Sequence, residues 1–428
     1  MNGIVFLVLL IGLFILGVPV AFSLGITAVV LMLMQYGTIQ INTLAQMTVS
    51  GINSFTMLAV PLFLLAGKLM NTGGITNRLF NFAKVIIGFL PGGLGHVNVV
   101  SSIIFAGMSG TAVSDAGGLG AIEIKAMKDH GFDTDFACAV TSASSTIGPI
   151  IPPSLPMVVY GMMASASVGA LFMAGILPGL LMAAVMMVVV TVYAVKNNYP
   201  REPFPTVKAL FISLKEGILP LMTPIIIIGG IYSGYFTATE AAVVAVVYSF
   251  ILSVFVYKEM NMKQLTDVLR ETVKDSATIG LILATSALYG NVLIRAQIPQ
   301  QLLELLTGSI SSPIVMMLIL NVFLLIVGCF MEPISAITIL MPLLNPLIQA
   351  MGINPVHFGV VMVLNLMIGL LTPPFGMVLF VISRIGDISI IRLTKALIPW
   401  IGALLFTLLI LSLFPQISLF LPKALGML

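Results

Sequence analysis

The chain has 428 residues, of which 59% are hydrophobic and only 8% are charged, and its mean hydropathy is +1.17. A soluble globular protein of this length could not bury so much apolar surface, so the lipid bilayer must be its solvent. The net charge of +3 is small and scattered, which excludes a nucleic-acid surface and leaves no nucleic acid among the expected partners.

Motifs of common enzyme classes are missing from the sequence. The two cysteines and three histidines are far apart and form no metal-binding pattern, and neither GxxxxGK[ST] nor HExxH occurs. No intramembrane Ser/His or paired-Asp constellation is evident, so we expect no enzyme. The first Lys or Arg is Lys68, so the N-terminus lacks the basic region of a signal peptide, and we expect the leading apolar run to be retained.

Apolar segments of crossing length follow one another along the chain. Residues 3–34 are interrupted at Gly17-Val18-Pro19, and about 32 residues exceed one crossing. The segment is thus either one long tilted helix or two short helices, and the interruption favours two. The other expected elements are an amphipathic segment 38–56, a crossing 57–71, an interfacial helix 75–90, a hairpin 94–128, a broken helix 133–166, a crossing 168–195, a polar loop 196–215, crossings 217–236 and 238–257, a charged connector 258–275, a helix 276–292, an arm 298–310, a hairpin 313–351, a broken helix 355–383 and a last crossing 396–414.

The stretch from Gly107 to Ser154 is apolar enough for a bilayer but is broken twice. The first break is Ser109-Gly110-Thr111, and the second is Gly148-Pro149-Ile150-Ile151-Pro152-Pro153. Because proline cannot donate to the carbonyl four residues earlier, the second break should release the carbonyls of Ser145, Gly148 and Pro149. Unpaired carbonyls at membrane depth are costly unless they line a cavity or hold a ligand, so this stretch is a predicted site.

The same stretch recurs 221 residues later without a gap. The corresponding pairs are Gly107 and Gly328, Ser114 and Ser335, Gly131 and Gly352, Gly148 and Gly369, and Pro152-Pro153 and Pro373-Pro374. An internal repeat of this kind is the usual signature of a secondary transporter. On this basis we divide the chain into N-terminal scaffold and first arm (1–92), first hairpin and broken helix (93–167), scaffold helices (168–275), scaffold helix and second arm (276–312), second hairpin and broken helix (313–383) and C-terminal helix (384–428).

The distribution of Lys and Arg gives an orientation. These residues concentrate at 78–84, 125–128, 196–215, 258–274 and 384–395, which the positive-inside rule places in the cytoplasm. The first hairpin carries Lys125 and Lys128 at its base, whereas Pro346 and Gln349 occupy the equivalent positions of the second. The copies therefore face opposite ways, as alternating access requires. Glu123 and Asp129, near the cytoplasmic base, should be solvated charges.

The segments SGTAVSDAGGLGAIEIKAMKDHGF…TIGPIIPPS and FMEPISAITILMPLLNPLIQAMGINPVHFGVVMVLNLMIGLLTPPFGMVLF resemble the large membrane subunit of TRAP (tripartite ATP-independent periplasmic) transporters. The resemblance covers nearly the whole chain. It implies an all-α, inverted-repeat, elevator-type transporter of the bacterial inner membrane, with two re-entrant helical hairpins and two broken transmembrane helices. It also implies coupling to Na+, a separate small four-helix membrane subunit, and a periplasmic substrate-binding protein that delivers an organic-acid anion such as a C4-dicarboxylate or sialic acid.

Two or more sodium ions are expected at the breaks, because unwound carbonyls, half-helix ends and hydroxyls supply the oxygen ligands that sodium prefers. The candidates are Ser109, Gly110, Thr111, Ser114, Asp115, Gly148, Pro149 and Ile151 in the first copy, and Gly328, Glu332, Ser335, Gly369 and Thr372 in the second. The alternative is that Ser and Gly only permit close helix packing. An intramembrane acid such as Asp115 is a functional candidate that could balance the cation or cap its helix.

The substrate anion should meet the N-terminal ends of half-helices, whose free N–H groups attract carboxylates. The candidates are Ser154, Phe375 and Gly376 after the breaks, the hydroxyl run with Thr141, Ser142 and Ser145, and Arg295. Arg295, at the predicted outer end of its helix, could pair with the carboxylate during passage or with Glu304 at the surface. A stand-alone ion-coupled dicarboxylate carrier with similar hairpins remains an alternative, as does a channel.

Overall fold

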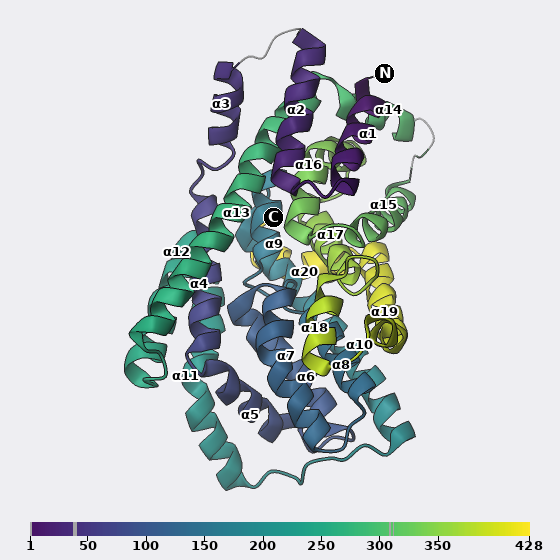
Figure 1. The fold of residues 1–428 in the computed structure, drawn as a ribbon. Helices are drawn as coiled ribbons and strands as arrows, with labels where there is room; N and C mark the ends of the chain where they lie inside the picture. Colours follow the sequence, from purple (N-terminus) through teal and green to yellow (C-terminus); the bar gives the residue numbers. More distant parts are fainter. Residues whose placement is uncertain (1, 37–40, 308–309, 311) are drawn as a thin grey trace.

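The computed structural model describes residues 2–36, 41–307, 310 and 312–428; at residues 2–7, 36, 41, 108–109 and 305–307 the backbone alone is described. All secondary structure in this part of the chain is helical (Figure 1). Six of the described helices are long and apolar enough to cross a membrane, and seven if a bent pair counts as one span. The expected all-helical, multi-pass membrane fold is therefore confirmed.

The N-terminal region forms short helices joined by sharp turns. Its elements are α1 (Asn2–Ile15), α2 (Val20–Tyr36), α3 (Ile41–Ser50), the 3₁₀ turn η1 (Thr56–Leu58), α4 (Ala59–Thr72) and α5 (Ile75–Ile87). The separation of α1 from α2 confirms the two short helices expected from the Gly-Val-Pro interruption. The segment 56–72 and α5 are bent by 72° at a break that contains Gly74, whose φ of +72° suits glycine.

In the region of the predicted first hairpin and broken helix, the chain forms four helices. They are α6 (Gly93–Ser109), α7 (Ala112–Asp129), α8 (Thr134–Ser145) and α9 (Leu155–Ala164). The Thr111 hydroxyl accepts the Ser114 N–H and begins α7, and the Ser154 hydroxyl accepts the Met157 N–H and begins α9. Gly131, with φ +83°, turns the chain from the hairpin into the broken helix.

The middle of the chain holds long helices. They are α10 (Val168–Asn197), α11 (Val207–Tyr232), α12 (Ala238–Ile251) with the π-turn η2 (Leu252–Val256), α13 (Met262–Arg295) and α14 (Ile298–Thr307). The expected connector 258–275 is wrong from Met262 onward, because Asn261 and Gln264 form a reciprocal capping box that begins one continuous helix. The polar loop 196–215 likewise ends early, where Thr206 caps α11.

The second copy repeats the first almost residue for residue. It comprises α15 (Pro313–Gly328), α16 (Pro333–Ala350), α17 (Pro355–Gly369) and α18 (Met377–Gly386), and it is followed by α19 (Ile390–Leu413) and α20 (Gln416–Ala424). Both ends of α16 lie 221 residues after those of α7. Neither broken helix continues through its Pro-Pro pair, as predicted.

Two helix groups face each other across the molecule. On one side α13 packs against α2 and α4, and α4 packs against α12; on the other, α18 packs against α7 and α8, and α8 against α19 (Figure 1). The first halves of the broken helices, α8 and α17, lie at the centre, since all residues from Phe136 to Ser145 and from Val356 to Gly369 are buried. This packing brings the ends of the broken segments together in the middle of the fold.

Candidate functional site

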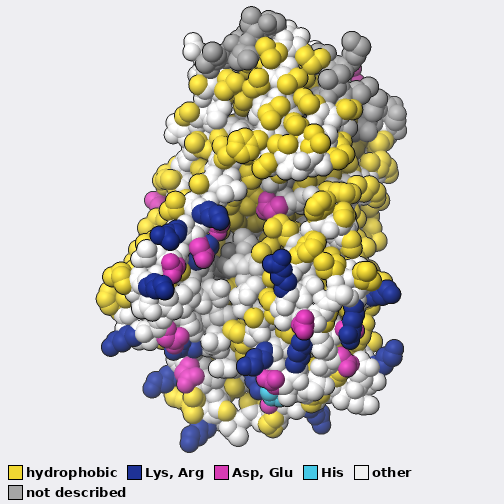
Figure 2. Space-filling view, viewed as in Figure 1, with side chains coloured by type: hydrophobic (Ala, Val, Ile, Leu, Met, Phe, Trp, Pro, Cys, Tyr) yellow, Lys and Arg dark blue, Asp and Glu magenta, His cyan; other side chains and the backbone are white. Residues whose placement is uncertain are grey.

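A cavity of about 680 Å³ lies where both hairpin tips meet the helices α4 and α13. Figure 2 shows a hollow near the middle of this face, with charged side chains gathered along its α13 side. Six segments contribute its lining, which includes Lys68, Asn71, Thr111, Ser114, Gly117, Gly118, Leu155, Glu271, Asp275, Thr278, Glu332, Ser335 and Met377. Four of the residues predicted at the hairpin tips, Thr111, Ser114, Glu332 and Ser335, therefore share one cavity.

The tip of the first hairpin is tied to the first break by backbone contact. Gly110 has φ +62°, and its carbonyl accepts the Leu155 N–H at 3.3 Å. A Cβ on Gly110 would lie 2.8 Å from the Pro153 carbonyl, so only glycine fits. The neighbouring Ser109 side chain lies outside the described residues. The hairpin tip and the broken helix are thus positioned as one unit.

The second tip is held in a similar way. The Phe375 N–H donates to the Cys329 carbonyl at 3.1 Å, and a Cβ on Gly369 would lie 2.4–2.6 Å from the backbone of Gly328. The Glu332 carboxylate accepts both the N–H and the hydroxyl of Ser335, at 3.1 and 3.3 Å. Glu332 therefore caps α16 at the same position at which Thr111 caps α7.

Asp115 is 1% exposed, and its Oδ2 atom has no hydrogen-bond donor in the part of the chain that the structure describes. The point that a Cβ would occupy on Gly148 lies 3.3 Å from the Ser145 carbonyl and 3.8 Å from both Asp115 Oδ2 and the Thr111 carbonyl. Three oxygens thus approach Gly148 on the side where no side chain separates them. This set of hard oxygen donors fits a sodium ion.

The proline-rich break releases fewer carbonyls than its sequence indicates. The Ser145 carbonyl accepts the Gly148 N–H at 3.3 Å, and the Pro149 carbonyl accepts the Ser154 hydroxyl, so both have partners. The Gly148 carbonyl alone of the three receives no donor from the described residues. The Ile151 side chain packs against Gly179 of α10, away from the hairpin tip. A short turn has rebuilt part of the hydrogen bonding that the prolines remove.

In the second break, the residues predicted to bind sodium mostly bond to one another. The Thr372 hydroxyl donates to the Gly369 carbonyl at 2.8 Å and lies 3.0 Å from Cys329 Sγ. No group of three His, Cys, Asp or Glu side chains among the described residues is placed to hold a metal ion. Any cation at the breaks would therefore rely on backbone and hydroxyl oxygens as well as single carboxylates.

The wall opposite the hairpin tips carries an ion cluster that the sequence interpretation missed. Lys68 of α4 contacts Asp275 and Glu271 of α13, with Nζ–O distances of 2.7 and 3.2 Å. Among the described lining residues Lys68 is the single cation. The signal was present, because Lys68 is an isolated cation inside an otherwise apolar crossing, and such residues are functional candidates. The sequence interpretation placed Glu271 and Asp275 in the connector 258–275, whereas both belong to α13.

The predicted substrate-binding residues do not line this cavity. Thr141, Ser142 and Ser145 are buried, and each hydroxyl donates to a carbonyl of its own helix. Ser154 is also buried, with its hydroxyl occupied by the helix cap. Gly376 begins α18 without a side-chain cap, and Phe375 is 61% exposed.

Arg295 ends α13 and is exposed, and its carbonyl accepts a bond from Gln35. Asp275 lies 20 residues before it on the same helix, so the two are separated by about 30 Å along the axis. Arg295 therefore lies at the end of α13, whereas the Lys68 cluster contacts the interior of the same helix.

Glu123 contradicts its predicted solvation, since it is 1% exposed. Its Oε2 atom accepts a bond from the Asn98 amide at 2.7 Å, because the face of α7 that carries Glu123 packs between α6 and α8. Asp129, by contrast, is exposed as expected. Proximity in sequence to Lys125 and Lys128 does not decide which way a helical side chain points.

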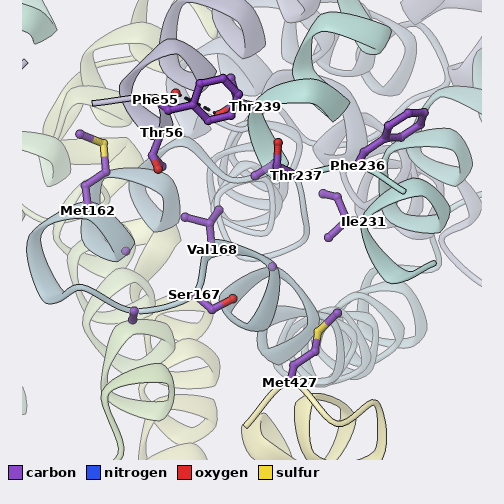
Figure 3. Close-up of a pocket in the computed structure, with 14 residues that line it drawn as sticks. Phe55, Thr56, Met162, Ser167, Val168, Ile231, Phe236, Thr237, Thr239 and Met427 are labelled. Carbon is purple, nitrogen blue, oxygen red and sulfur yellow. Dashed lines mark hydrogen bonds between the residues drawn. The ribbon is translucent and has the colours of Figure 1, made fainter. Parts of the chain in front are cut away.

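A second cavity, of about 470 Å³, lies among loops at another part of the fold (Figure 3). Phe55, Phe236, Met162 and Met427 line it together with hydroxyl residues such as Thr237, and Thr239 donates to the Phe55 carbonyl at 3.1 Å. None of its described lining residues is charged. The cavity at the hairpin tips is therefore the better candidate for a charged ligand.

Comparison with known proteins agrees with this architecture. A family model described as "Tripartite ATP-independent periplasmic transporter, DctM component" matches residues 7–417. The chain is 45% identical over 412 residues to the sialic acid TRAP transporter large permease protein SiaM of Vibrio cholerae, with 96% of each chain covered. It is 39% identical over 405 residues to the C4-dicarboxylate TRAP transporter large permease protein DctM of Pseudomonas aeruginosa, with 95% of each covered.

Among solved structures, the YdaH transporter of Alcanivorax borkumensis superposes with a TM-score of 0.64 at 13% identity, covering 88% of this chain and 89% of that one. This similarity shows a shared fold. The full-length match to the family model, together with relatives at about 40% identity, decides the family. The chain belongs to the DctM component family of tripartite ATP-independent periplasmic transporters.

Proposed function

We propose that this chain is the large permease of a sodium-coupled, binding-protein-dependent carrier that imports an organic-acid anion by an elevator mechanism. The observation that carries the proposal is the cavity in which both hairpin tips face Lys68 and the acids of α13. A cavity built from two broken segments on one side and long helices on the other suits a site that moves against a fixed wall.

Sodium would bind where several oxygens converge. In the first copy these are Asp115 Oδ2 and the Thr111 and Ser145 carbonyls around Gly148, and in the second they are at the tip that bears Glu332. A cation at these points offsets the charge of acids that lie at membrane depth. It would also make the cavity less negative, because Glu271, Asp275 and Glu332 outnumber Lys68 there. Sodium binding would thus favour binding of an anion.

The wall of α4 and α13 would supply a cation at each end of the anion's path. Lys68 lies beside the cavity, and Arg295 lies about 30 Å away along α13, a distance close to the thickness of the hydrocarbon core. In the elevator proposal these residues contact the anion at different points of its path. Arg295 would contact it at the outer end of the path, and Lys68 near the inner end. Figure 2 supports this orientation, because Lys and Arg gather in the lower part of the molecule while the upper part of that face is largely apolar.

The proposed assembly has three parts, as the family description states. A small four-helix subunit would cover part of the apolar outer surface, and a periplasmic binding protein would deliver the anion to a permease in the bacterial inner membrane. Relatives named for sialic acid and for C4-dicarboxylates place both acids among the first substrates to test.

Reconstituted uptake tests the proposal most directly. Proteoliposomes would contain this chain with or without the small subunit, and radiolabelled sialic acid or a C4-dicarboxylate would be supplied with or without a binding protein and an inward sodium gradient. We expect saturable uptake when all components and the gradient are present. Uptake by this chain alone would favour the stand-alone carrier, and uptake without a sodium gradient would refute the coupling.

A further inference from the structure

Glu123 lies in the middle of a polar cluster that the proposed transport site does not use. Its carboxyl group comes from α7, one oxygen accepts the Asn98 amide of α6, and the other oxygen, Oε1, has no donor among the described residues. Glu123 is 1% exposed and Asn98 is fully buried. This acid is therefore removed from water, and its hydrogen bonding is only half satisfied.

The surrounding hydroxyls fix Asn98 rather than Glu123. The Asn98 amide donates a second bond to Thr141 at 2.7 Å, and its oxygen accepts the Ser144 hydroxyl at 2.6 Å. The Thr141 hydroxyl in turn donates to the Ala137 carbonyl. The hydroxyls of Thr141 and Ser144 are thus committed to other acceptors, and neither stabilises a negative charge on Oε1.

No cation stands beside Glu123 either. Besides Glu123, the charged or titratable side chains on α7 and on the helices packed against it are Asp115, Lys125, Lys128 and Asp129 on α7, His96 on α6, Arg78 and Lys84 on α5, Asp135 and Cys138 on α8 and Arg384 on α18. Within the described residues the ion pairs of this group join Arg78 to Glu259, Lys84 to Glu202 and Asp135 to Arg392, and none includes Glu123. A buried carboxylate without a cation is strongly disfavoured relative to the neutral acid.

We propose that Glu123, held by Asn98, is a proton-binding site within the first repeat, separate from the cation sites at the hairpin tips. The proton comes from water at the nearby base of α7, where Lys125 and Lys128 mark the cytoplasmic end, and forms an O–H bond at Oε1. Binding neutralises the carboxyl group. The site is particular to the first repeat, because the equivalent position in the second is Leu344.

A pH dependence follows from this assignment. With the proton bound, the Glu123 carboxyl group between α6, α7 and α8 is neutral. At alkaline pH the loss of this proton leaves an uncompensated negative charge on Glu123. On the proposed transport function, uptake should therefore fall as the pH rises, and Glu123→Gln should remove this fall. Gln retains an oxygen that can accept the Asn98 bond and never ionises.

Infrared spectroscopy of the purified full-length chain tests the site without relying on transport. We expect a carbonyl band of protonated carboxylic acid at neutral pH that loses the Glu123 component in Glu123→Gln and is unchanged in Glu216→Gln, a matched control at an exposed acid of α11. A band unchanged in Glu123→Gln would overturn the proposal. If Glu123→Gln does not fold, Glu123→Leu, which carries the residue of the second repeat, allows the same comparison.

The uptake arm uses the reconstituted system with both variants. We expect Glu123→Gln to transport within about twofold of the wild type at neutral pH and to lose the alkaline decline, while Glu216→Gln keeps it. A pH profile of Glu123→Gln identical to that of the wild type would contradict the regulatory role. Absence of all uptake in the wild type would instead count against the proposed function and leave the infrared result to decide the proton site.

Discussion

The two repeats share a backbone but differ in charge. α7 and α16 begin and end at equivalent positions, and each starts on a side-chain cap, Thr111 in the first and Glu332 in the second. Yet α7 buries two acids, Asp115 and Glu123, where α16 has Ala336 and Leu344. The comparison teaches that caps and prolines set the shape of the repeat, whereas a few side chains decide which ions each copy can hold.

The copies also differ in how tightly their breaks are packed. Gly369 touches the Gly328 backbone, so a Cβ there would lie 2.4 Å from a backbone atom, whereas a Cβ on Gly148 meets nothing nearer than 3.3 Å. The first break is therefore less tightly packed around its glycine, and the second is closed by direct contact between glycines. Equivalent glycines thus serve different purposes.

The largest expected effect on stability tests this packing difference. Gly369→Ala should lower the free energy of unfolding by about 3 kcal/mol, because its methyl group would overlap backbone that cannot move away cheaply. Gly148→Ala should cost under about 1 kcal/mol, but its methyl group would lie 3.3 Å from the Ser145 carbonyl, crowd the proposed sodium ligands and reduce sodium-dependent uptake. Thermal unfolding in detergent measures the stability of both variants, and uptake assays measure their transport. Equal destabilisation of the two variants would contradict the difference in packing between the breaks.

The next prediction concerns Asp115, the buried acid with an oxygen that lacks a hydrogen-bond donor among the described residues. Asp115→Asn keeps the side-chain volume but removes the charge, so sodium-dependent uptake should fall by about a hundredfold, equivalent to about 2.7 kcal/mol. Glu332→Gln should cost less, because the Gln oxygen can still accept the Ser335 N–H and keep the cap. Asp129→Asn, at an exposed position of the same helix, is the control. Unaltered sodium dependence in Asp115→Asn would show that the first repeat holds no sodium there.

A third test compares the repeats with the wall that faces them. Lys68→Gln should reduce uptake of the anion by about tenfold, or about 1.4 kcal/mol, and Arg295→Ala should abolish uptake while the chain still folds. If Lys68 only pairs with its acids, the double variant Lys68→Gln/Asp275→Asn should recover transport; if it binds the anion, the double variant should stay impaired. Normal transport by Arg295→Ala would retire its role in the passage of the anion.

The smallest effect concerns the N-terminal ends of α9 and α18, the second halves of the two broken helices. α9 is capped by Ser154, whereas α18 begins at Gly376 without a cap. Ser154→Ala should therefore destabilise the protein by about 1 kcal/mol. Gly376→Ser, in contrast, should not stabilise it, since a Cβ there would lie 2.7 Å from the Leu370 carbonyl. Unfolding midpoints of both variants measure the contrast, and a gain in stability for Gly376→Ser would contradict it.

The sequence by itself determined the bilayer as solvent, the repeat, the two breaks and the family. Hydropathy, prolines, glycines and capping residues act within a few positions along the chain, so their consequences can be predicted locally. Even there, the prolines of the first break released fewer carbonyls than expected, because the Gly148 N–H and the Ser154 hydroxyl took up two of them.

Only the tertiary structure decided which side chains meet. Lys68 and Asp275 are more than 200 positions apart and come together because α4 packs against α13. Glu123 is buried because its face of α7 meets α6 and α8, and the hydroxyls of α8 bond within their own helix rather than line the cavity. Hydropathy of one segment cannot specify these directions, because the rotation of a helix about its axis depends on its neighbours.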